Sequence, residues 1–279
     1  MAFRTITTVL TDPEANAASL KTAMELASRE NAHLDVLCLG LDRTQPGFYY
    51  AGANAMVVQD NLTQAREDSE RLEDYARGLL QGADFNWAAT GVSAQMVALN
   101  GLIAHRTRFS DLVVLPRPYG EGRSHDFEAI TEAAMFDGDA PVLIQPDGMD
   151  WPDQVRTVLV GWNESMEALR AIRAALPLLQ RAENVNITIV DPPQHGPERS
   201  DPGGALSQML SRHGVRPEVS VLSKTLPRIC DVLTRHAGDI GADLVVMGAY
   251  GHSRFRESIL GGATRNMLEL AEVPVLMAH

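Results

Sequence analysis

The chain of 279 residues is long enough for one large or two ordinary domains, and its 45% hydrophobic and 22% charged residues are typical of a globular protein. Its two cysteines exclude a disulfide framework and a multi-cysteine zinc site, and a formal net charge of −12 argues against a general nucleic-acid surface. No run approaches the roughly 18 apolar residues of a membrane span, and Asp12 and Glu14 interrupt the N-terminal stretch where a signal peptide would stay apolar. We therefore expect a cytoplasmic protein with neither a membrane nor a nucleic-acid partner.

Three segments of the first half recur in the same order in the second half. TTVLTDPEANAASLKTAMELA (7–27) aligns with RTVLVGWNESMEALRAIRAAL (156–176), SDLVVLPRP (110–118) with ADLVVMGAY (242–250), and APVLIQPDG (140–148) with VPVLMAH (273–279). The spacing from DLVV to PVL is 30 residues in the first half and 31 in the second. This repetition predicts a duplicated chain, with domains at 1–148 and 155–279 and a linker over 146–155.

Two stretches of the first half resist assignment to a strand or a helix. Residues 43–60 (RTQPGFYYAGANAMVVQD) are apolar and aromatic yet contain turn residues, so they could cap their own domain or lie on the other one. Residues 118–126 (PYGEGRSHD) have the composition of an exposed loop.

The second half alternates short β-rich runs with segments of helical periodicity. Strands are predicted at 156–162, 184–192, 216–224, 242–249 and 273–279, helices at 164–182, 203–214, 226–241 and 263–272, and an exposed loop at 192–204. Alternating units of this length imply a mostly parallel sheet with helices on both faces. The predicted fold class is therefore α/β, with two tandem doubly wound parallel-sheet domains.

The two halves differ in charge. Residues 1–150 contain 11 Lys and Arg against 22 Asp and Glu, a net of −11, whereas residues 151–279 contain 13 against 14, a net of −1. An anionic ligand therefore fits the second half better.

The stretch GAYGHSRFRESILGGATRN (248–266) places two pairs of glycines around a basic segment with Arg254 and Arg256. Gly248 and Gly251 would let a ligand approach bare backbone amides. The pair at 261 and 262 precedes the last predicted helix, whose first-turn N–H groups and dipole favour an anion. The pattern predicts a phosphate site, although two ordinary glycine turns around a surface loop would have the same composition.

This stretch, followed by VPVLMAH, resembles the nucleotide loop and last strand of the universal stress protein family. The family pattern is Gly, two residues, Gly, nine residues, Gly and a small polar residue, and the resemblance extends to LVGWNES (159–165), IVDP (189–192) and ADLVVMG (242–248). It implies an adenine-nucleotide alpha-hydrolase-like fold with strand order 3-2-1-4-5 in each domain.

The resemblance also implies which residues bind ATP or another adenine nucleotide, with Mg as a candidate companion. The adenine and ribose positions of the family match Trp162, Asn163, Ile189, Val190 and Met247, and the phosphate positions match Gly248, Gly251, His252, Arg254, Gly261, Gly262, Ala263 and Thr264. Asn163 stands where many members have Asp, and Gly262 stands where a Ser or Thr usually donates to phosphate. These departures weaken the site, while Thr264 keeps a second hydroxyl.

The first half departs further from the family pattern. Pro116 and Pro118 remove backbone donors where the glycine loop should begin, and the acidic residues Glu121, Asp126 and Glu128 would repel phosphate. Asp12 is expected to cap the first helix. We expect this half to be structural.

Signatures of catalysis are few. GHSRF lacks the last glycine of a nucleophile elbow, no Gly-x4-Gly-Lys-Ser/Thr loop occurs, and the eight histidines have no metal-ligand spacing. We therefore assign no catalytic or metal-binding residue. The leading hypothesis is a nucleotide-sensing stress protein; the alternatives are a tandem interaction module without nucleotide and a slow ATP hydrolase or phosphotransferase.

The last strands of the two halves, PVLIQP (141–146) and PVLMAH (274–279), would be apolar sheet edges if left open. Dimers of the resembling family pair through this strand. We expect the tandem chain to pair these strands internally, and a homodimer remains an alternative.

Overall fold

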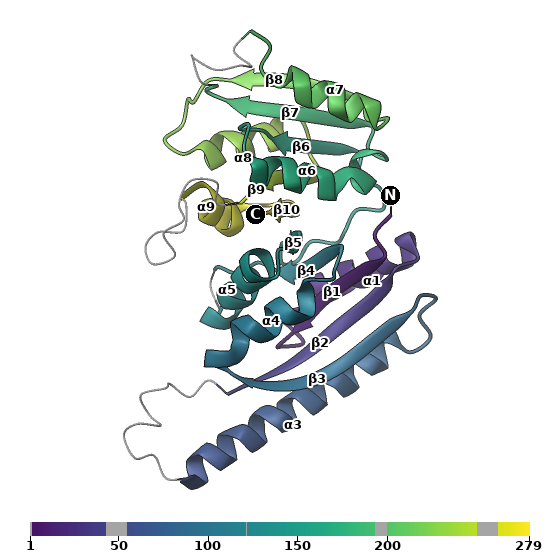
Figure 1. The fold of residues 1–279 in the computed structure, drawn as a ribbon, viewed down its shortest axis with the longest axis vertical. Helices are drawn as coiled ribbons and strands as arrows, with labels where there is room; N and C mark the ends of the chain where they lie inside the picture. The colour runs from purple at the N-terminus through teal and green to yellow at the C-terminus, as the bar shows by residue number, and fades with distance from the viewer. Residues whose placement is uncertain (1, 43–54, 121, 193–199, 250–261) are drawn as a thin grey trace. The chain divides into compact units, whose positions relative to one another are not determined.

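The computed structural model describes residues 2–42, 55–120, 122–192, 200–249 and 262–279. The chain divides into two compact units, Ala2–Val142 and Leu143–His279. Each unit alternates strands and helices around a parallel sheet, which confirms the α/β prediction (Figure 1). None of the helices in the described ranges is both long and apolar enough to span a membrane.

The sheet of the first half has the order β3-β2-β1-β4-β5. Its strands are β1 (Thr5–Leu10), β2 (His33–Asp42), β3 (Trp87–Gln95), β4 (Leu112–Pro116) and β5 (Val142–Gln145). Its helices are α1 (Ala17–Glu30), α3 (Ala55–Leu80), α4 (Leu99–Thr107) after a 3-10 turn at Met96–Ala98, and α5 (His125–Glu132), which continues as a π-helical turn at Ala133–Asp137. The boundary between the two units falls inside β5.

The second half repeats this arrangement with the order β8-β7-β6-β9-β10. Its strands are β6 (Thr157–Gly161), β7 (Asn184–Val190), β8 (Pro217–Leu222), β9 (Leu244–Gly248) and β10 (Val275–Ala278). Its helices are α6 (Met166–Leu179), α7 (Gly204–Arg212), α8 (Ile229–Asp239) and α9 (Gly262–Leu270). Both halves therefore have the predicted strand order 3-2-1-4-5.

Burial explains why the central strands read as continuous apolar runs. Every residue of β4 and the first four residues of β9 are buried, as expected for parallel strands that are covered by helices on both faces. Cys38 and Cys230 are both buried and unpaired, which confirms their interpretation as small core residues. Burial raises the pKa of the Cys38 thiol to about 12, so this thiol is unreactive at neutral pH.

The repeat alignment is correct for the helices but wrong by three residues for the first strands. The first residues of α1 and α6, Ala17 and Met166, lie 149 positions apart, as the alignment has them. Ile6 and Val158, which hold the same place beside the fourth strand of their sheets, lie 152 positions apart. The connection from these equivalent strand positions to the first helix is therefore three residues longer in the first unit, and the β1–α1 loop itself is two residues longer than the β6–α6 loop.

Several sequence predictions lie outside the described residues. These are the segment 43–54, Glu121, and most of the loops at 192–204 and 248–262. The internal pairing of 141–146 with 274–279 stays a prediction.

Candidate functional site

The carboxyl ends of β6, β7 and β9 meet at one edge of the second sheet. Gly161, the last residue of β6, pairs with Thr188 of β7 on one side and with Met247 of β9 on the other. Helix α6, which follows β6, packs on one face of the sheet, whereas α8 and α9 pack together on the other face (Figure 1). This divergence is the topological switch point at which open α/β sheets bind their ligands.

The β6–α6 loop is shaped by its own side chains. Ser165 caps α6, because its Oγ accepts a hydrogen bond from Ala168 N at 3.1 Å. Asn163 Oδ1 accepts from Ser165 N at 3.2 Å, and Glu164 between them adopts the left-handed region with φ 61°. Asn163 is exposed, but its side-chain oxygen is already engaged within the loop.

Trp162 lies at the start of this loop with an unsatisfied donor. Its backbone N donates to Thr188 O at 3.0 Å, which continues the β6–β7 ladder. Its indole Nε1 is buried and has no hydrogen-bond partner among the residues that the structure describes. Leaving a buried N–H unpaired costs about 1–3 kcal/mol, so an acceptor on a bound molecule would stabilise this position.

The apolar residues at the switch point lie deeper. Met247 and Ile189 are buried, and Val190 is half-buried. They can form the floor of a site but offer little surface to a ligand.

Helix packing requires glycine at position 248, which sequence analysis did not anticipate. A Cβ at this position would overlap Ala168 N and would lie 2.8 Å from the carbonyl carbon of Glu167. The glycine therefore allows the first turn of α6 to pack directly on β9, whether or not a ligand binds there.

The remaining phosphate-site residues are only partly within the described structure. Gly251, His252, Arg254 and Gly261 lie outside the described residues. Gly262 and Ala263 open α9, and the side chain of Thr264 is buried in its first turn. Since α9 precedes β10, which pairs in parallel with β9, the N-terminus of α9 lies at the carboxyl edge of the sheet.

Sequence analysis missed a polar cluster beside the end of β9. His279 Nδ1 lies 3.1 Å from Ala249 O, and Arg170 of α6 donates to His279 O at 2.7 Å. The backbone N–H of Glu167, with Ser165, His279 and Arg170, holds the pKa of the Glu167 carboxyl below its usual value. Helical spacing places Arg170 one turn after the start of α6, but only the tertiary structure brings it to this edge.

The corresponding edge of the first unit is occupied by its own loop. Asn16 is buried; its Oδ1 accepts from Thr11 N and from Asp12 N, each at 3.0 Å, and its Nδ2 donates to Val9 O at 3.0 Å. The prediction that Asp12 caps the first helix is wrong. Asp12 Oδ1 instead accepts from the backbone amides of the next turn, at 2.9 and 2.8 Å, ahead of the first residue of α1 at position 17.

The loop after β4 closes over this edge. Arg123 donates to Ala15 O at 3.1 Å, and its guanidinium carbon lies 4.8 Å from the centroid of the Phe127 ring. Tyr119 is buried and its hydroxyl donates to Glu128 Oε1 at 3.2 Å. Protein groups therefore hold the backbone of the β1–α1 loop where a ligand would have to bind.

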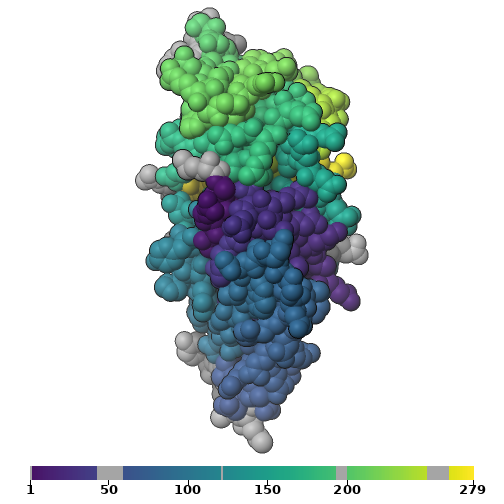
Figure 2. Space-filling view, turned by 90° about the vertical axis from the view of Figure 1, so that its right-hand side faces the viewer, coloured from purple at the N-terminus to yellow at the C-terminus, as the bar shows by residue number. Residues whose placement is uncertain are grey.

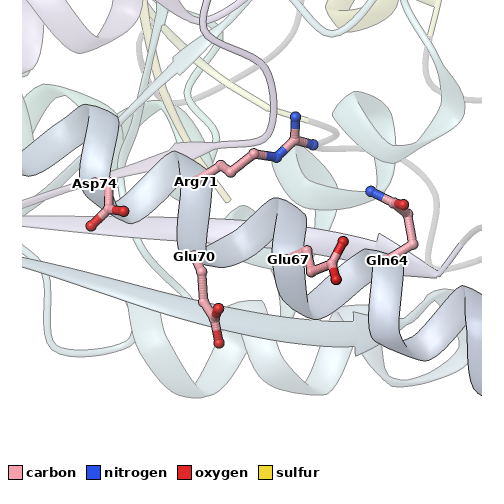
Figure 3. A pocket seen from close by; sticks show the side chains of 5 residues that line it. All are labelled: Gln64, Glu67, Glu70, Arg71 and Asp74. Carbon is pink, nitrogen blue, oxygen red and sulfur yellow. The ribbon is translucent and has the colours of Figure 1, made fainter.

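A surface hollow on α3 offers a different chemistry. It is lined by Gln64, Glu67, Glu70, Arg71 and Asp74 (Figure 3). The side chains of Glu70 and Arg71 point to opposite sides of the helix (Figure 3), and three of the five lining residues are carboxylates, which disfavour phosphate. Figure 2 shows the surfaces of α1 in purple and α3 in blue on one face of the first unit.

In the part of the chain that the structure describes, no group of three or more His, Cys, Asp or Glu could hold a metal ion.

Comparison with known proteins agrees with this fold. Residues 154–279 match the sequence model of the Universal stress protein family. A universal stress protein of Synechocystis sp. is 33% identical over 73 residues, which are 26% of this chain and 24% of that protein. The chain thus matches about a quarter of the length of this curated relative.

Two solved structures resemble the chain over nearly its whole length. A universal stress protein from Archaeoglobus fulgidus DSM 4304 is 15% identical, with 98% of this chain and 97% of that chain covered and a TM-score of 0.72. A putative universal stress protein from Pseudomonas aeruginosa UCBPP-PA14 is 16% identical, with 99% and 92% covered and a TM-score of 0.58. At these identities the two structures show the fold alone, and that fold is a tandem α/β protein. The second half of the chain, residues 154–279, therefore has the sequence pattern of the universal stress protein family.

Proposed function

We propose that the second unit binds ATP or a related adenine nucleotide at the carboxyl edge of β6, β7 and β9, and that the protein acts as a regulatory or sensing module. The observation that carries the proposal is the indole N–H of Trp162 at the switch point, which is buried and has no hydrogen-bond partner within the described ranges. In this proposal Trp162 Nε1 donates to an acceptor on the base or ribose. Met247 and Ile189 form the apolar floor beneath it.

The phosphates would lie towards the N-terminus of α9, whose first-turn amides and dipole favour anions. Gly251, Gly261 and Thr264 are the proposed phosphate-binding positions, and Mg would accompany the phosphates. The near-neutral charge of the second half supports this choice, since the first half carries a net charge of −11 from 11 basic and 22 acidic residues. The engaged amides around Asn16 support a single site per chain.

Two observations favour the alternative, a tandem interaction module without nucleotide. The packing of α6 explains Gly248 without a ligand, and Asn163 Oδ1 is already hydrogen-bonded within its loop. A slow ATP hydrolase is a third hypothesis, which a turnover assay with Mg-ATP would test.

Thermal melts with and without Mg-ATP, ADP and AMP test the proposal. A nucleotide at about 100-fold above its dissociation constant should add roughly 2.7 kcal/mol to the free energy of unfolding of the second unit. Gly261→Glu should abolish this gain, because it places a negative charge ahead of the α9 N-terminus. Trp162→Phe keeps a ring but removes the N–H, and should weaken binding by about 0.5–1.5 kcal/mol.

The matched control is Tyr119→Phe in the first unit, which removes only the hydroxyl that contacts Glu128. This variant should bind nucleotide like the wild type. If no nucleotide moves the wild-type melting temperature, the interaction-module hypothesis replaces the proposal.

A further inference from the structure

The outer edge of β3, at one end of the first sheet, is closed by side chains. Leu34 N donates to Asn86 O at 2.9 Å, so the backbone N–H and C=O groups of the even-numbered residues of β3 point towards β2. The backbone groups of Ala89 and Gly91 therefore point outward. Glu73 Oε2 accepts from Gly91 N at 2.6 Å, and Arg77 Nη2 donates to Ala89 O at 3.1 Å. The two side chains of α3 therefore take the place of a neighbouring strand.

Two glycines allow α3 to lie close enough for these bonds. A Cβ at Gly40 of β2 would overlap Ala65 O of α3, and a Cβ at Gly91 of β3 would lie 3.0 Å from Ser69 O. Glu73 and Arg77 also pair with each other one turn apart on the helix. A charged, occupied edge of this kind prevents a second strand from adding to the sheet.

In the described parts of the chain, no side chain hydrogen-bonds to the outer edge of β8, at the end of the second sheet. Asp191 N donates to Leu222 O at 2.8 Å, so the even-numbered residues of β8 face β7 and the backbone groups of Val219 and Val221 face outward. Within the described ranges, no hydrogen bond to these outward groups is present. The side chains of Val219 and Val221 are 41% and 52% exposed on the face that α7 covers only in part.

The sequence around β8 is complementary to itself. In an antiparallel pair centred on Ser220, Val219 of one copy lies opposite Val221 of the other, so the four valines form one apolar patch. Glu218 lies opposite Leu222 and diagonal to Lys224 of the other copy, which avoids a Glu–Glu contact and places opposite charges within reach.

The charge of the two halves favours contact between second units. The second half has 13 basic and 14 acidic residues, whereas the first half, with 11 and 22, would repel another copy of itself. We propose that β8 pairs with β8 of a second copy of this chain, in an antiparallel arrangement centred on Ser220 that joins the two sheets.

Sedimentation velocity of the full chain without nucleotide, over a wide concentration range, tests this interface. We expect a reversible dimer, and we expect Val221→Lys to raise its dissociation constant by about tenfold or more, since the symmetric contact is lost twice. Val97→Lys is the matched control, because Val97 is 80% exposed in the first unit and should leave the dimer unchanged. A thermal melt of each variant shows whether it still folds.

Cysteine cross-linking tests the register. Both native cysteines are buried, so Ser220→Cys should form a covalent dimer under mild oxidation, because the two copies of this position face each other. A chain that stays monomeric, a dimer that Val221→Lys leaves intact, or a dimer that Ser220→Cys does not cross-link would each overturn the proposal.

Discussion

The two units have the same strand order, but the carboxyl edges of their sheets differ in how the polar groups there are hydrogen-bonded. In the first unit, buried Asn16 holds the amides of the loop after β1, and Arg123 reaches from the loop after β4 to bond Ala15 O. In the second unit, the equivalent loop is two residues shorter, and the indole N–H of Trp162 is buried without a hydrogen-bond partner in the described part of the chain. A duplicated fold can therefore keep its topology while one edge closes on itself and the other keeps an unsatisfied donor.

The shorter loop also changes how the first helix packs on the fourth strand. Gly248 at the end of β9 permits direct contact with the first turn of α6. The equivalent position of the first unit, at the end of β4, holds Pro116, and this residue is buried. In this unit the β1–α1 loop is the longer one. The end of β4 therefore accommodates the ring of Pro116, whereas the end of β9 excludes even a Cβ at position 248.

The largest expected effect distinguishes two asparagines in the β1–α1 and β6–α6 loops. Asn16→Ala should lower the free energy of unfolding by about 3 kcal/mol, because it removes the buried hydrogen bond to Val9 O and the two part-buried bonds from Thr11 N and Asp12 N. Asn163→Ala should lower it by less than about 1 kcal/mol, since this exposed side chain accepts one hydrogen bond. Urea unfolding of both variants measures the difference, and equal losses would contradict the contrast between the loops.

A smaller effect is expected at the ends of β9 and β4. Gly248→Ala should destabilise the second unit by about 1–3 kcal/mol, because the added Cβ overlaps the first turn of α6. Pro116→Ala keeps a Cβ that the first unit already accommodates, and should cost about 1 kcal/mol or less. The two melting temperatures are compared with the wild type; a neutral Gly248→Ala would show that α6 can move away from β9.

The smallest effect concerns the closed edge of β3. Hydrogen bonds from Arg77 and from the Gly91 amide hold the pKa of Glu73 below its usual value. Because the folded pKa is lowered, this stabilisation is present above the ordinary glutamate pKa of about 4.3 and is lost as the pH falls through the folded value. We expect the loss to be below about 1 kcal/mol, since the pair is partly exposed to solvent.

Unfolding at neutral pH and at pH below the ordinary glutamate value measures this contribution. Glu73→Gln should remove it, so the variant loses less stability on acidification than the wild type. Glu70→Gln is the control, because Glu70 pairs with Arg66 on the exposed side of α3 and contacts no strand backbone in the described structure. The same acid response in both variants would argue against the edge contact.

Much of the fold could be predicted from the sequence because its signals are local. Apolar runs such as those of β4 and β9, helical periodicity and the repeated DLVV and PVL segments are readable within a few residues, and they led to the correct fold class. The correct strand order was implied by the family resemblance. The glycine spacing and LVGWNES led to the family that the match over residues 154–279 supports.

The candidate site could be predicted only in part. The sequence placed Trp162 at the end of β6, but burial of its N–H without a partner depends on the packing around it. Gly248 was singled out as a position where a ligand approaches the backbone, which stays a prediction, while the neighbour that excludes a side chain there is α6.

The sequence by itself determined the duplicated βα pattern, the burial of both cysteines and the uneven charge, since each depends on composition or on neighbouring residues. Only the tertiary structure decided which edges are closed. The Arg123–Ala15 bond joins residues 108 positions apart, and Gly91 and Glu73 come from different elements. No local pattern encodes such contacts, because their geometry follows from how helices settle on the sheet: where glycine lets a helix approach, its side chains reach the strand backbone and satisfy it.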